Sequence, residues 1–405
     1  MKKIILATVI MLTGCTAEIP NDTINYERIR TPSPMFQTIP NEQNIPNENE
    51  CYSPLNFDRR KAIWLSYIDL APMLSADNAD DFSMAFDSAC LDITELGCNT
   101  IYVHVRPFGD ALYDSVLFPP SEYLCGDYDP LEIICDTAHG YGLSVHAWIN
   151  PLRLQTADKL ADFTDFKTSE WFINGDDKVS YIDSNGHLWL NPAYSEVRDL
   201  IAEGAYEIAE NYDIDGIHYD DYFYPTTDSD FDAKCFAETG ADSSLDEWRR
   251  DNISKMCHEI YKTVKSVDSR IEVSISPQGN MENNYHKLYA DVKKWISEEG
   301  YCDRVIPQIY FGYDNTVKPF ISTLNEWQQI CESGNVALDI GLAIYKIGSE
   351  EEFTDNTSII ARQIEDCSLC QGVSLYSYSS LFGENRNDER IINERESIRN
   401  ALSKY

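Results

Sequence analysis

The sequence predicts an α/β protein whose fold class is a (β/α)8, or TIM, barrel. From Lys61 onward, short apolar runs of strand length alternate with helical patterns, and this unit recurs eight times before the chain ends at Tyr405. Strict alternation of strand and helix indicates a parallel sheet, and eight such units are the number that closes a barrel. The alternative is an open, doubly wound sheet. No Gly-x-Gly-x-x-Gly turn follows the first expected strand, and the count of eight favours closure.

Each expected strand is an apolar run bounded by polar or turn-forming residues. The runs cover residues 61–67, 98–107, 143–151, 214–221, 271–279, 303–311, 337–348 and 370–381. A helical pattern follows each run, and a long insertion separates the third run from the fourth. We therefore expect one barrel domain over residues 57–405.

The first fifteen residues have the pattern of an export signal. Lys2 and Lys3 precede an apolar run, Ile4 to Leu12, that is too short to span a bilayer. The run ends in LTGC, which resembles the lipobox of bacterial lipoproteins. By this resemblance, residues 1–14 are a lipoprotein signal peptide and Cys15 is the lipidation site. We expect an extracytoplasmic protein, lipid-anchored to a bacterial membrane.

The segment from Cys15 to residue 56 is predicted to be a lipidated, disordered tether. It is rich in Pro, Asn, Thr and Glu, has few apolar residues and shows no hydrophobic period. At no more than ~3.5 Å per residue, such a chain reaches on the order of 100 Å.

Composition narrows the possible partners. The chain has 32 Lys and Arg against 68 Asp and Glu, a net charge of −36, so its surface repels phosphates and we expect no nucleic-acid partner. Neutral sugars remain possible, and aromatic residues, 12% of the chain, could stack on them. Most of the cysteines in the expected core elements are predicted to be small buried side chains, and these are Cys90, Cys98, Cys135, Cys257 and Cys331 of the 12 in the chain. Cys367 and Cys370 form a lone CxxC without further ligand motifs, so we expect no metal and no cofactor.

Polar residues alternate with apolar ones along the expected strands, although strands buried on both faces are usually almost entirely apolar. Because successive side chains of a strand point to opposite faces, one set packs under the helices and the polar set points into the barrel. Unpaired burial of so many polar groups would cost several kcal/mol each. They gather toward the carboxyl ends of the strands, where barrel active sites lie. The candidate residues for binding a substrate at this mouth are His104, Arg106, Asp110, His146, Trp148, Asn150, Asn191, His218, Tyr222, Gln308, Tyr310, Lys346 and Tyr376.

The fourth run, DIDGIHYDDYFYP, ends in an aspartate pair. Asp220 is in phase with His218 and is expected to point into the barrel mouth. Asp221 would point outward if the strand continued, but Pro225 and the aromatic residues indicate that the strand ends here. Asp221 therefore either turns into the mouth or caps the next segment. Asp220 and Asp221 are the predicted catalytic residues, with Asp220 the stronger candidate.

Several segments, in order along the chain, resemble one known family. They are VHVRPFGDALYDS, VHAWINPLR, LNPAYSEVRDLI, DIDGIHYDDYFYP, SISPQG, PQIYF and GLAIYKIG. They are similar to segments of the glycosyl hydrolase-like family ten proteins, once called domain of unknown function 187. That family includes bacterial lipoproteins, some of which act on the glycan strands of peptidoglycan. The resemblance covers residues from about Lys61 to Leu381 and implies a (β/α)8 glycosidase.

The end of the fourth run is also similar to the strand-four ending of α-amylase-type barrels, in which Asp-Gly is followed, after three residues, by the catalytic Asp. That match implies that Asp220 takes the place of their nucleophile. Those barrels carry a glutamic acid after strand five, whereas here the strand ends Ser-Pro-Gln-Gly, and His218 stands where they have Arg. The acid/base therefore remains open among Asp221, Asp110 and Asp314.

The leading functional hypothesis is a membrane-tethered glycoside hydrolase. It would act on peptidoglycan glycan, or on another extracytoplasmic polysaccharide, with two carboxyl groups at the barrel mouth, one ionised and one protonated. A catalytically silent carbohydrate-binding lipoprotein on the same barrel is the alternative, because the strand-five Glu is missing. A metal-dependent amidohydrolase barrel is the third hypothesis. The first strand, IWLSYID, carries no His-x-His and disfavours it.

Overall fold

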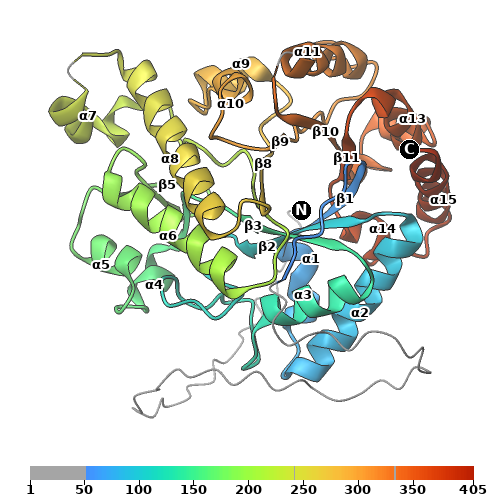
Figure 1. Ribbon diagram of the computed structural model, residues 1–405, viewed down its shortest axis with the longest axis horizontal. Coiled ribbons are helices and arrows are strands. Elements are labelled where there is room, and N and C mark those ends of the chain that lie inside the picture. The colour runs from blue at the N-terminus through green and yellow to red at the C-terminus, as the bar shows by residue number, and fades with distance from the viewer. Residues whose placement is uncertain (1–51, 241, 333) are drawn as a thin grey trace, which may run out of the picture. The chain divides into compact units, whose positions relative to one another are not determined.

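The computed structural model describes residues 52–240, 242–332 and 334–405. Eight parallel strands form a closed barrel in the order β1-β11-β10-β9-β8-β7-β3-β2, which is chain order around the ring once the insertion is left out. Helices surround the barrel on its outside (Figure 1). The (β/α)8 prediction is therefore confirmed, and the closed ring excludes the open doubly wound sheet.

The barrel strands are short. Their bounds are β1 Arg60–Leu65, β2 Thr100–Arg106, β3 Ser144–Ile149, β7 Gly216–Tyr219, β8 Glu272–Ile275, β9 Arg304–Val305, β10 Ala337–Leu342 and β11 Gly372–Leu375. All eight expected strands are present, but most end before the predicted residue. The largest difference is in β9, where Pro307 cannot donate a hydrogen bond to a neighbouring strand. Beyond it only the isolated bridges of Gln308 with Gln278 and Gly341 continue the pairing.

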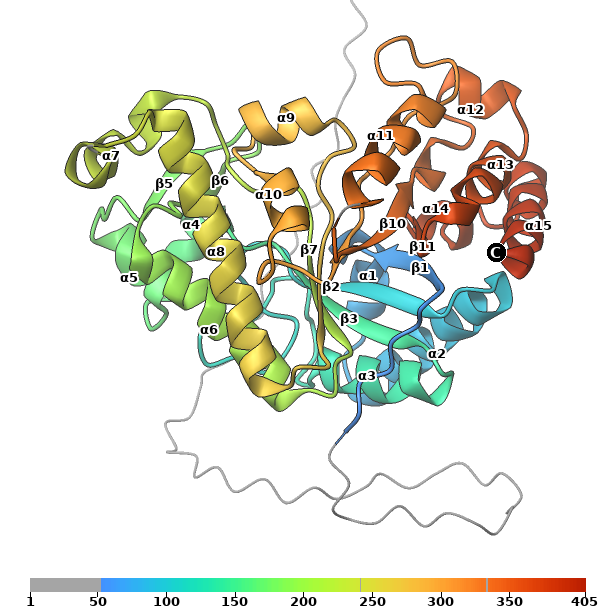
Figure 2. The ribbon, with the colours of Figure 1, turned by 45° about the horizontal axis from the view of Figure 1, so that its top comes forward.

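The helices are numbered in chain order. They are α1 Tyr67–Leu74, α2 Ala79–Leu96, α3 Pro130–Gly140, α4 Ala157–Ala161, α5 Lys167–Ile173, α6 Ser195–Asn211, α7 Ala233–Thr239, α8 Leu245–Val267, α9 Met281–His286, α10 Val292–Ser297, α11 Phe320–Glu332, α12 Glu351–Asp355, α13 Ile359–Asp366, α14 Ser379–Phe382 and α15 Glu389–Lys404. Helices α6 and α8 lie side by side on one flank of the barrel (Figure 2).

Local sequence signals set the ends of the long helices. Helix α8 begins with a capping box, in which Ser244 and Glu247 each accept a hydrogen bond from the other's backbone N–H. Helix α2 begins at Asn78, whose side chain accepts from the Asp81 N–H, and ends at Gly97 in the left-handed conformation. These caps satisfy the free backbone groups at the helix ends.

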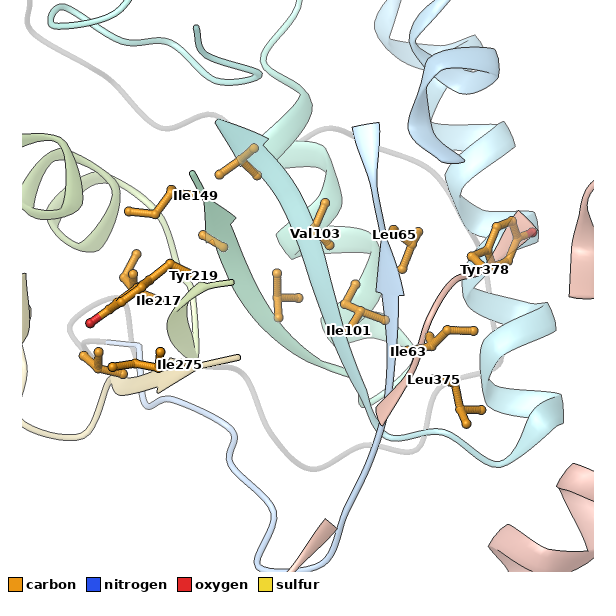
Figure 3. Packing of buried hydrophobic residues seen from close by; sticks show 14 of the residues in the cluster. Ile63, Leu65, Ile101, Val103, Ile149, Ile217, Tyr219, Ile275, Leu375 and Tyr378 are labelled. Atoms are coloured by element: carbon orange, nitrogen blue, oxygen red, sulfur yellow. The ribbon is translucent and has the colours of Figure 1, made fainter. Parts of the chain in front are cut away.

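The main core lies between the strands and the surrounding helices. The outward-facing residues of successive strands are apolar and fully buried, for example Ile101 and Val103 on β2 and Ile217 on β7 (Figure 3). The inward-facing residues form a second, smaller cluster within the barrel that includes Trp64, Tyr102 and Trp148. The predicted alternation of the two faces is therefore confirmed.

The insertion between β3 and β7 carries a sheet of its own. Its three antiparallel strands are β4 Arg153–Thr156, β5 Val179–Ile182 and β6 His187–Leu190, in the order β4-β6-β5. Arg153, the first residue of β4, follows β3 by only a few residues, so the insertion begins at the mouth of the barrel.

Charged residues fill the base of the barrel, at the amino ends of the strands. Arg60 Nη1 lies 2.5 Å from Glu272 Oε1, and Arg304 contacts both Glu272, at 3.1 Å, and Asp339, at 2.5 Å. Burial alone would raise the pKa of Glu272, but attraction to Arg60 and Arg304 outweighs it and lowers that pKa well below its ordinary value. The base is thus held by buried ion pairs rather than by an apolar plug.

Residues 52–56 close the base from outside. Tyr52 Oη donates to Asp215 Oδ1 over 2.5 Å, and the Leu55 N–H donates to the same carboxylate. Asn56 Nδ2 donates to the Asp215 carbonyl at 3.0 Å and its Oδ1 accepts from Arg60. The predicted boundary at residue 57 was therefore too late, because a segment poor in apolar residues is held by hydrogen bonds instead. The rest of the predicted tether and the signal peptide lie outside the described residues.

In the part of the chain that the structure describes, no helix combines the length and the apolar character needed to cross a membrane. The described cysteines are free thiols, and Cys90, Cys98, Cys135 and Cys257 are buried as predicted, while Cys331 is partly buried.

Candidate functional site

A cavity of about 380 Å³ opens at the carboxyl ends of the barrel strands. This volume lies in the range typical of small-molecule sites. The cavity is lined by Trp64, Ser66, Tyr67, Ile68, His104, Trp148, Asn150, Arg153, Asp220, Asp221, Tyr222, Ser276, Gln308, Tyr310, Tyr345 and Tyr376. Each of the eight barrel strands, or the segment that follows it, contributes at least one residue to the wall. We call it the mouth cavity.

Asp220 and Asp221 both reach the mouth cavity because β7 ends at Tyr219. Asp220 keeps the inward phase of the strand. After Asp221 the chain turns sharply, and the Phe223 N–H donates to the Asp221 carbonyl at 2.9 Å. Of the two orientations open for Asp221, the structure has the one that faces the mouth. These are the two carboxylates among the residues that line the cavity.

Two amides hold the Asp221 carboxylate. Gln278 Nε2 donates to Oδ2 at 2.9 Å, and Gln308 Nε2 donates to Oδ1 at 3.1 Å. Gln308 is itself fixed, since the same nitrogen also donates to the Ser276 carbonyl at 3.1 Å. A carboxylate that accepts one N–H on each oxygen is stabilised in its ionised form.

The two aspartates differ in how easily they ionise. Burial, followed by repulsion from Asp221, raises the pKa of Asp220 well above its ordinary value, while the Tyr222 N–H and Arg153 act weakly in the opposite direction. Burial raises the pKa of Asp221 as well, but by less than that of Asp220, because the hydrogen bonds from Gln278 and Gln308 partly offset it. The pair is therefore arranged to hold one proton, on Asp220, and one negative charge, on Asp221.

His104 lies on the opposite side of the mouth cavity from the β8 and β9 segments. Its ring stacks on Trp148, with centroids 3.7 Å apart and planes 8° from parallel. Burial, with repulsion from Arg153, lowers the pKa of His104 well below its ordinary value, so the ring is neutral. A neutral imidazole carries one donor and one acceptor.

Some polar atoms of the cavity wall are buried without a partner. Within the described residues, no hydrogen-bond partner is found for Trp148 Nε1 or Arg153 Nε, while the side chains of His104 and Asn150 lie within hydrogen-bonding reach of each other. Buried polar groups in proteins are almost always paired, with protein, water or ligand. Unpaired donors on one concave wall therefore indicate a site for a polar ligand.

Aromatic rings line much of the remaining wall. Tyr310 and Tyr376 lie with their centroids 6.0 Å apart and their planes 27° apart. Tyr345 packs edge-on against both rings. On the other side of the cavity, the Arg153 guanidinium lies 4.9 Å from the centre of the Tyr222 ring. Polar groups between aromatic rings suit a sugar, whose faces are apolar and whose edge carries hydroxyl groups.

Arg106, a predicted substrate-binding residue, points away from the mouth. The pairing of β2 with β3 shifts between His104 and Arg106, so a bulge reverses the alternation there. The Arg106 guanidinium lies 4.3 Å from the centre of the Phe118 ring and packs on helix α6. A Cβ atom at Gly204 of α6 would lie 2.1 Å from Arg106 Nη1, so the guanidinium lies directly against this helix. The assignment of Arg106 to the site was therefore wrong, because a period-two pattern does not detect a bulge.

His146 and His218 point into the barrel as predicted, but they lie below the mouth cavity. His218 accepts from Trp64 Nε1 at 3.0 Å and lies 2.9 Å from Ser274 Oγ. His146 lies deeper, 3.2 Å from Asn56 Oδ1 at the base. Burial is the main cause that lowers the pKa of both rings. They are packing residues of the barrel interior and do not line the cavity.

Three other predicted binding residues also lie elsewhere. Asp110 is fully buried in the segment after β2, where it accepts from the Phe108 N–H at 2.8 Å. Asn191 lines a separate cavity between β5 and the segment after β7. Lys346 donates to the Tyr310 carbonyl at 2.9 Å and pairs with Glu350 at 3.0 Å. Asp314, considered as an acid/base, is exposed and outside the mouth cavity.

The sequence reasoning missed some residues of the wall. Trp64 and Ser66 lie in phase on the first strand, where the alternation of KAIWLSY could have shown them. Arg153 is the last residue of VHAWINPLR, one of the segments that carry the family resemblance. Tyr67 follows the first strand directly and has no sequence signal of its own.

Metal-ligating side chains do not gather at this site. Over the described ranges, no three His, Cys, Asp or Glu side chains are grouped so that they could hold a metal ion.

The barrel and its mouth define a class of protein. A closed (β/α)8 barrel with two aspartates after its fourth strand, among aromatic and amide side chains, has the architecture of glycosidase-type barrels. The chain belongs to the glycosyl hydrolase-like 10 family, whose model matches residues 60–358.

Curated relatives carry the same description. The chain is 33% identical over 289 residues to the glycosyl hydrolase YngK of Bacillus subtilis (strain 168), which covers 64% of this chain and 55% of that protein. It is 30% identical over 326 residues to the glycosyl hydrolase DigH of Escherichia coli (strain K12), which covers 71% of this chain and 74% of that protein. The chain thus spans about half the length of the Bacillus relative.

Solved structures share the fold at low identity. The glycoside hydrolase domain of PgaB (BpsB) from Bordetella bronchiseptica superposes with a TM-score of 0.58 at 10% identity and covers 84% of this chain and 99% of its own. An endo-1,4-β-mannanase from Rhizomucor miehei superposes with a TM-score of 0.55 at 11% identity and covers 89% and 97%. At such identities the likeness concerns the fold.

Proposed function

We propose that the protein is a glycoside hydrolase that cleaves its substrate in the mouth cavity. The observation that carries this proposal is the aspartate pair in the mouth cavity, together with the unpaired buried donors Trp148 Nε1 and Arg153 Nε in the same wall. Such unpaired donors would otherwise cost ~1–3 kcal/mol each. A sugar with several hydroxyl groups could satisfy them together.

The proposed division of roles follows the charges of the pair. Asp220, whose pKa is raised, donates its proton to the glycosidic oxygen as the bond breaks. Asp221, held ionised by Gln278 and Gln308, faces the positive charge that develops on the sugar ring. The leaving group keeps the proton from Asp220, water supplies the hydroxyl group that the sugar gains, and the remaining proton of that water returns to Asp220. This assignment reverses the one drawn from the α-amylase-type barrels, in which Asp220 would be the ionised nucleophile.

For the substrate, we propose the glycan of peptidoglycan, or another polysaccharide outside the cytoplasm. Support comes from the family and from the N-terminal sequence. The same sequence supports a tether to a membrane through lipid on Cys15. The acidic surface agrees with a glycan that carries no phosphate.

The test is product release from purified sacculi, peptide-free glycan strands and a polysaccharide panel, read by mass spectrometry. Asp220→Asn and Asp221→Asn should each lower turnover by roughly two to four orders of magnitude. Asp314→Asn is the matched control, since it makes the same change at an exposed carboxylate outside the cavity and should keep wild-type turnover. A folded Asp220→Asn protein with wild-type turnover would remove Asp220 from the mechanism.

A second candidate function is that of a catalytically silent carbohydrate-binding protein. Gln278 favours it, because an amide occupies the position after the fifth barrel strand where α-amylase-type barrels have their acid. The two functions differ in one result. A catalytically silent protein would release no product from any substrate of the panel. It would still bind glycan, and the Asp220→Asn variant would bind it with the same affinity.

A further inference from the structure

A second cavity, of about 360 Å³, adjoins the mouth cavity. One wall is the segment after β8 together with the start of α9, and the other is the loop that leads from β9 to α11. It is lined by Asp221, Gln278, Gly279, Asn280, Asn283, Gln308, Tyr310, Phe311, Asn315, Val317 and Lys318. We call it the side cavity.

The two cavities share a wall. Asp221, Gln308 and Tyr310 line both of them, whereas Asp220 lines only the mouth cavity. One amide that holds Asp221, Gln308, belongs to both cavities, and the other, Gln278, belongs to the side cavity alone. The ionised carboxylate of the pair therefore lies on the boundary, and a ligand that passes over it would occupy both cavities at once.

The side cavity has the chemistry of a site for an uncharged polar chain. The Oδ1 atoms of Asn280 and Asn315 accept backbone N–H groups at 2.9 to 3.2 Å, so it is through their Nδ2 groups that these two side chains could donate to a ligand. Phe311 and Tyr310 add aromatic surface. Lys318 is neutralised by Glu326 at 3.1 Å, so apart from Asp221 the wall presents no uncompensated charge. Hydroxyl and acetamido groups fit this lining better than ionised groups.

We propose that the side cavity binds the continuation of the glycan beyond the bond that is cleaved. The protein would then cleave inside a chain and would not remove single terminal sugars. This inference rests on the proposed function for its catalytic part. The inference that the side cavity binds glycan does not depend on the proposed function, because sugar units bound there contribute affinity whether or not a bond is cleaved.

Val317 offers a way to fill the side cavity without touching the catalytic pair. It lies on the loop wall and its side chain is 79% exposed, so Val317→Trp adds bulk without disturbing the core. Thr316→Trp is the matched control, because it puts the same ring on the neighbouring exposed position, which does not line the cavity.

The experiment measures affinity against chain length. Chitooligosaccharides of two to eight sugars serve as probes, since they carry hydroxyl and acetamido groups without charge, and binding to the Asp220→Asn protein is followed by calorimetry. We expect affinity to rise with length. In the Val317→Trp background the advantage of the longest over the shortest probe should shrink at least tenfold, while Thr316→Trp keeps it. The proposal is overturned if long probes bind no better than short ones, if none binds, or if Val317→Trp behaves like Thr316→Trp.

Turnover separates this inference from the proposed function. With a cleaved substrate, wild type should first release fragments of intermediate length. Release of single terminal sugars alone would overturn internal cleavage while leaving the hydrolase in place. Length-dependent binding without any product would support glycan binding in the side cavity and would reject the proposed hydrolase activity.

Discussion

At the scale of residues, the proposed chemistry depends on two neighbouring carboxyl groups in unequal surroundings. Each oxygen of Asp221 accepts an amide N–H, while Asp220 has only the Tyr222 N–H, at 3.5 Å, and the distant influence of Arg153. The same strand end thus supplies a proton donor and a negative charge. Two side chains of one residue type gain different roles because the glutamines reach only one of them.

The pH profile of kcat/KM should be bell-shaped. Asp220 must be protonated, so activity falls as pH rises through its raised pKa, and Asp221 must be ionised, so activity falls as pH drops through its own. In Asp221→Asn the like charge next to Asp220 is gone, so the pKa of Asp220 falls and the basic limb of the residual activity should move to lower pH. An unmoved basic limb would show that another group is the acid. The same profile for Asp314→Asn controls for general charge effects.

The sequence indicated Asp220 and Asp221 because a carboxylate pair directly after a strand is rare and the phase of one strand is short-range information. It also indicated His104 and Trp148, which follow simple alternation. The prediction that Arg106 lines the site was wrong because a bulge reverses the alternation of the strand there. His146 and His218 do point into the barrel as predicted, but they lie below the mouth cavity. Height depends on strand register, which no single strand encodes.

At the scale of elements, the barrel is closed at its base by ion pairs, and its open mouth is lined by aromatic and amide side chains. Arg60, Glu272 and Arg304 begin three of the barrel strands, and Asp339 lies near the start of a fourth. Arg304 pairs with Glu272 and Asp339 from the two strands beside its own, and Arg60 pairs with Glu272 across the interior of the barrel. The cost of burying them is offset only while the set is complete.

Glu272→Gln should lower the free energy of unfolding by about 3–5 kcal/mol at neutral pH, because it leaves a buried arginine uncompensated. The pKa of Glu272 is lowered in the folded protein, so its contribution is full above its unfolded pKa of about 4.3 and is lost progressively as pH falls from there toward its much lower folded pKa. The difference in free energy of unfolding between Glu272→Gln and wild type should therefore become smaller at acidic pH.

Urea unfolding at several pH values measures this difference. Glu282→Gln is the control, since its side chain is 71% exposed and pairs with His286 on the surface of α9, so it should stay within about 0.5 kcal/mol of wild type. A Glu272→Gln protein as stable as this control would show that the base layer does not hold the barrel.

The eight strands were predictable from the sequence because each combines an apolar run with flanking turns, and such a signal is local. Their ends were not. Strand β9 was expected to reach residue 311 but ends at Val305. Apolar and polar residues continue to alternate past Pro307, although the hydrogen bonds that define a strand do not. The small sheet β4–β6 lay inside what the sequence showed only as an insertion, because its strands of four residues are too short for a clear period.

At the scale of the whole molecule, the barrel includes residues 52–56, and the preceding residues are predicted to contribute nothing to its stability. Deleting residues 16–51 should leave the melting temperature unchanged. Extending the deletion through residue 56 should lower it by several degrees, because the buried Asp215 carboxylate loses the hydrogen bonds from Tyr52 and Leu55. Calorimetry on the two deletions compares them directly. An equal melting temperature would show that residues 52–56 only rest on the barrel.

Cys15→Ser should release the protein from membranes or leave its signal peptide uncleaved. The reason is that lipid would be attached at this sulfur after cleavage of residues 1–14. Fractionation of cells and the mass of the N-terminal peptide measure both effects. Cys51→Ser, a second cysteine of the N-terminal segment, is the control and should fractionate as wild type. Equal membrane association of both variants would mean that something other than lipid on Cys15 holds the protein.

The contact of residues 52–56 with the base of the barrel fixes an orientation. The chain enters the domain at the closed end of the ring, and Asp220 and Asp221 lie at the open end. If the N-terminus is anchored to a bilayer, as we propose, the barrel is attached to the membrane through its base. Its open end is then free to turn outward, toward polymer strands that lie above the lipid headgroups. A pulling force on the N-terminal segment would act on Tyr52 and its neighbours at the base of the barrel. It would not act directly on Asp220 and Asp221 at the mouth.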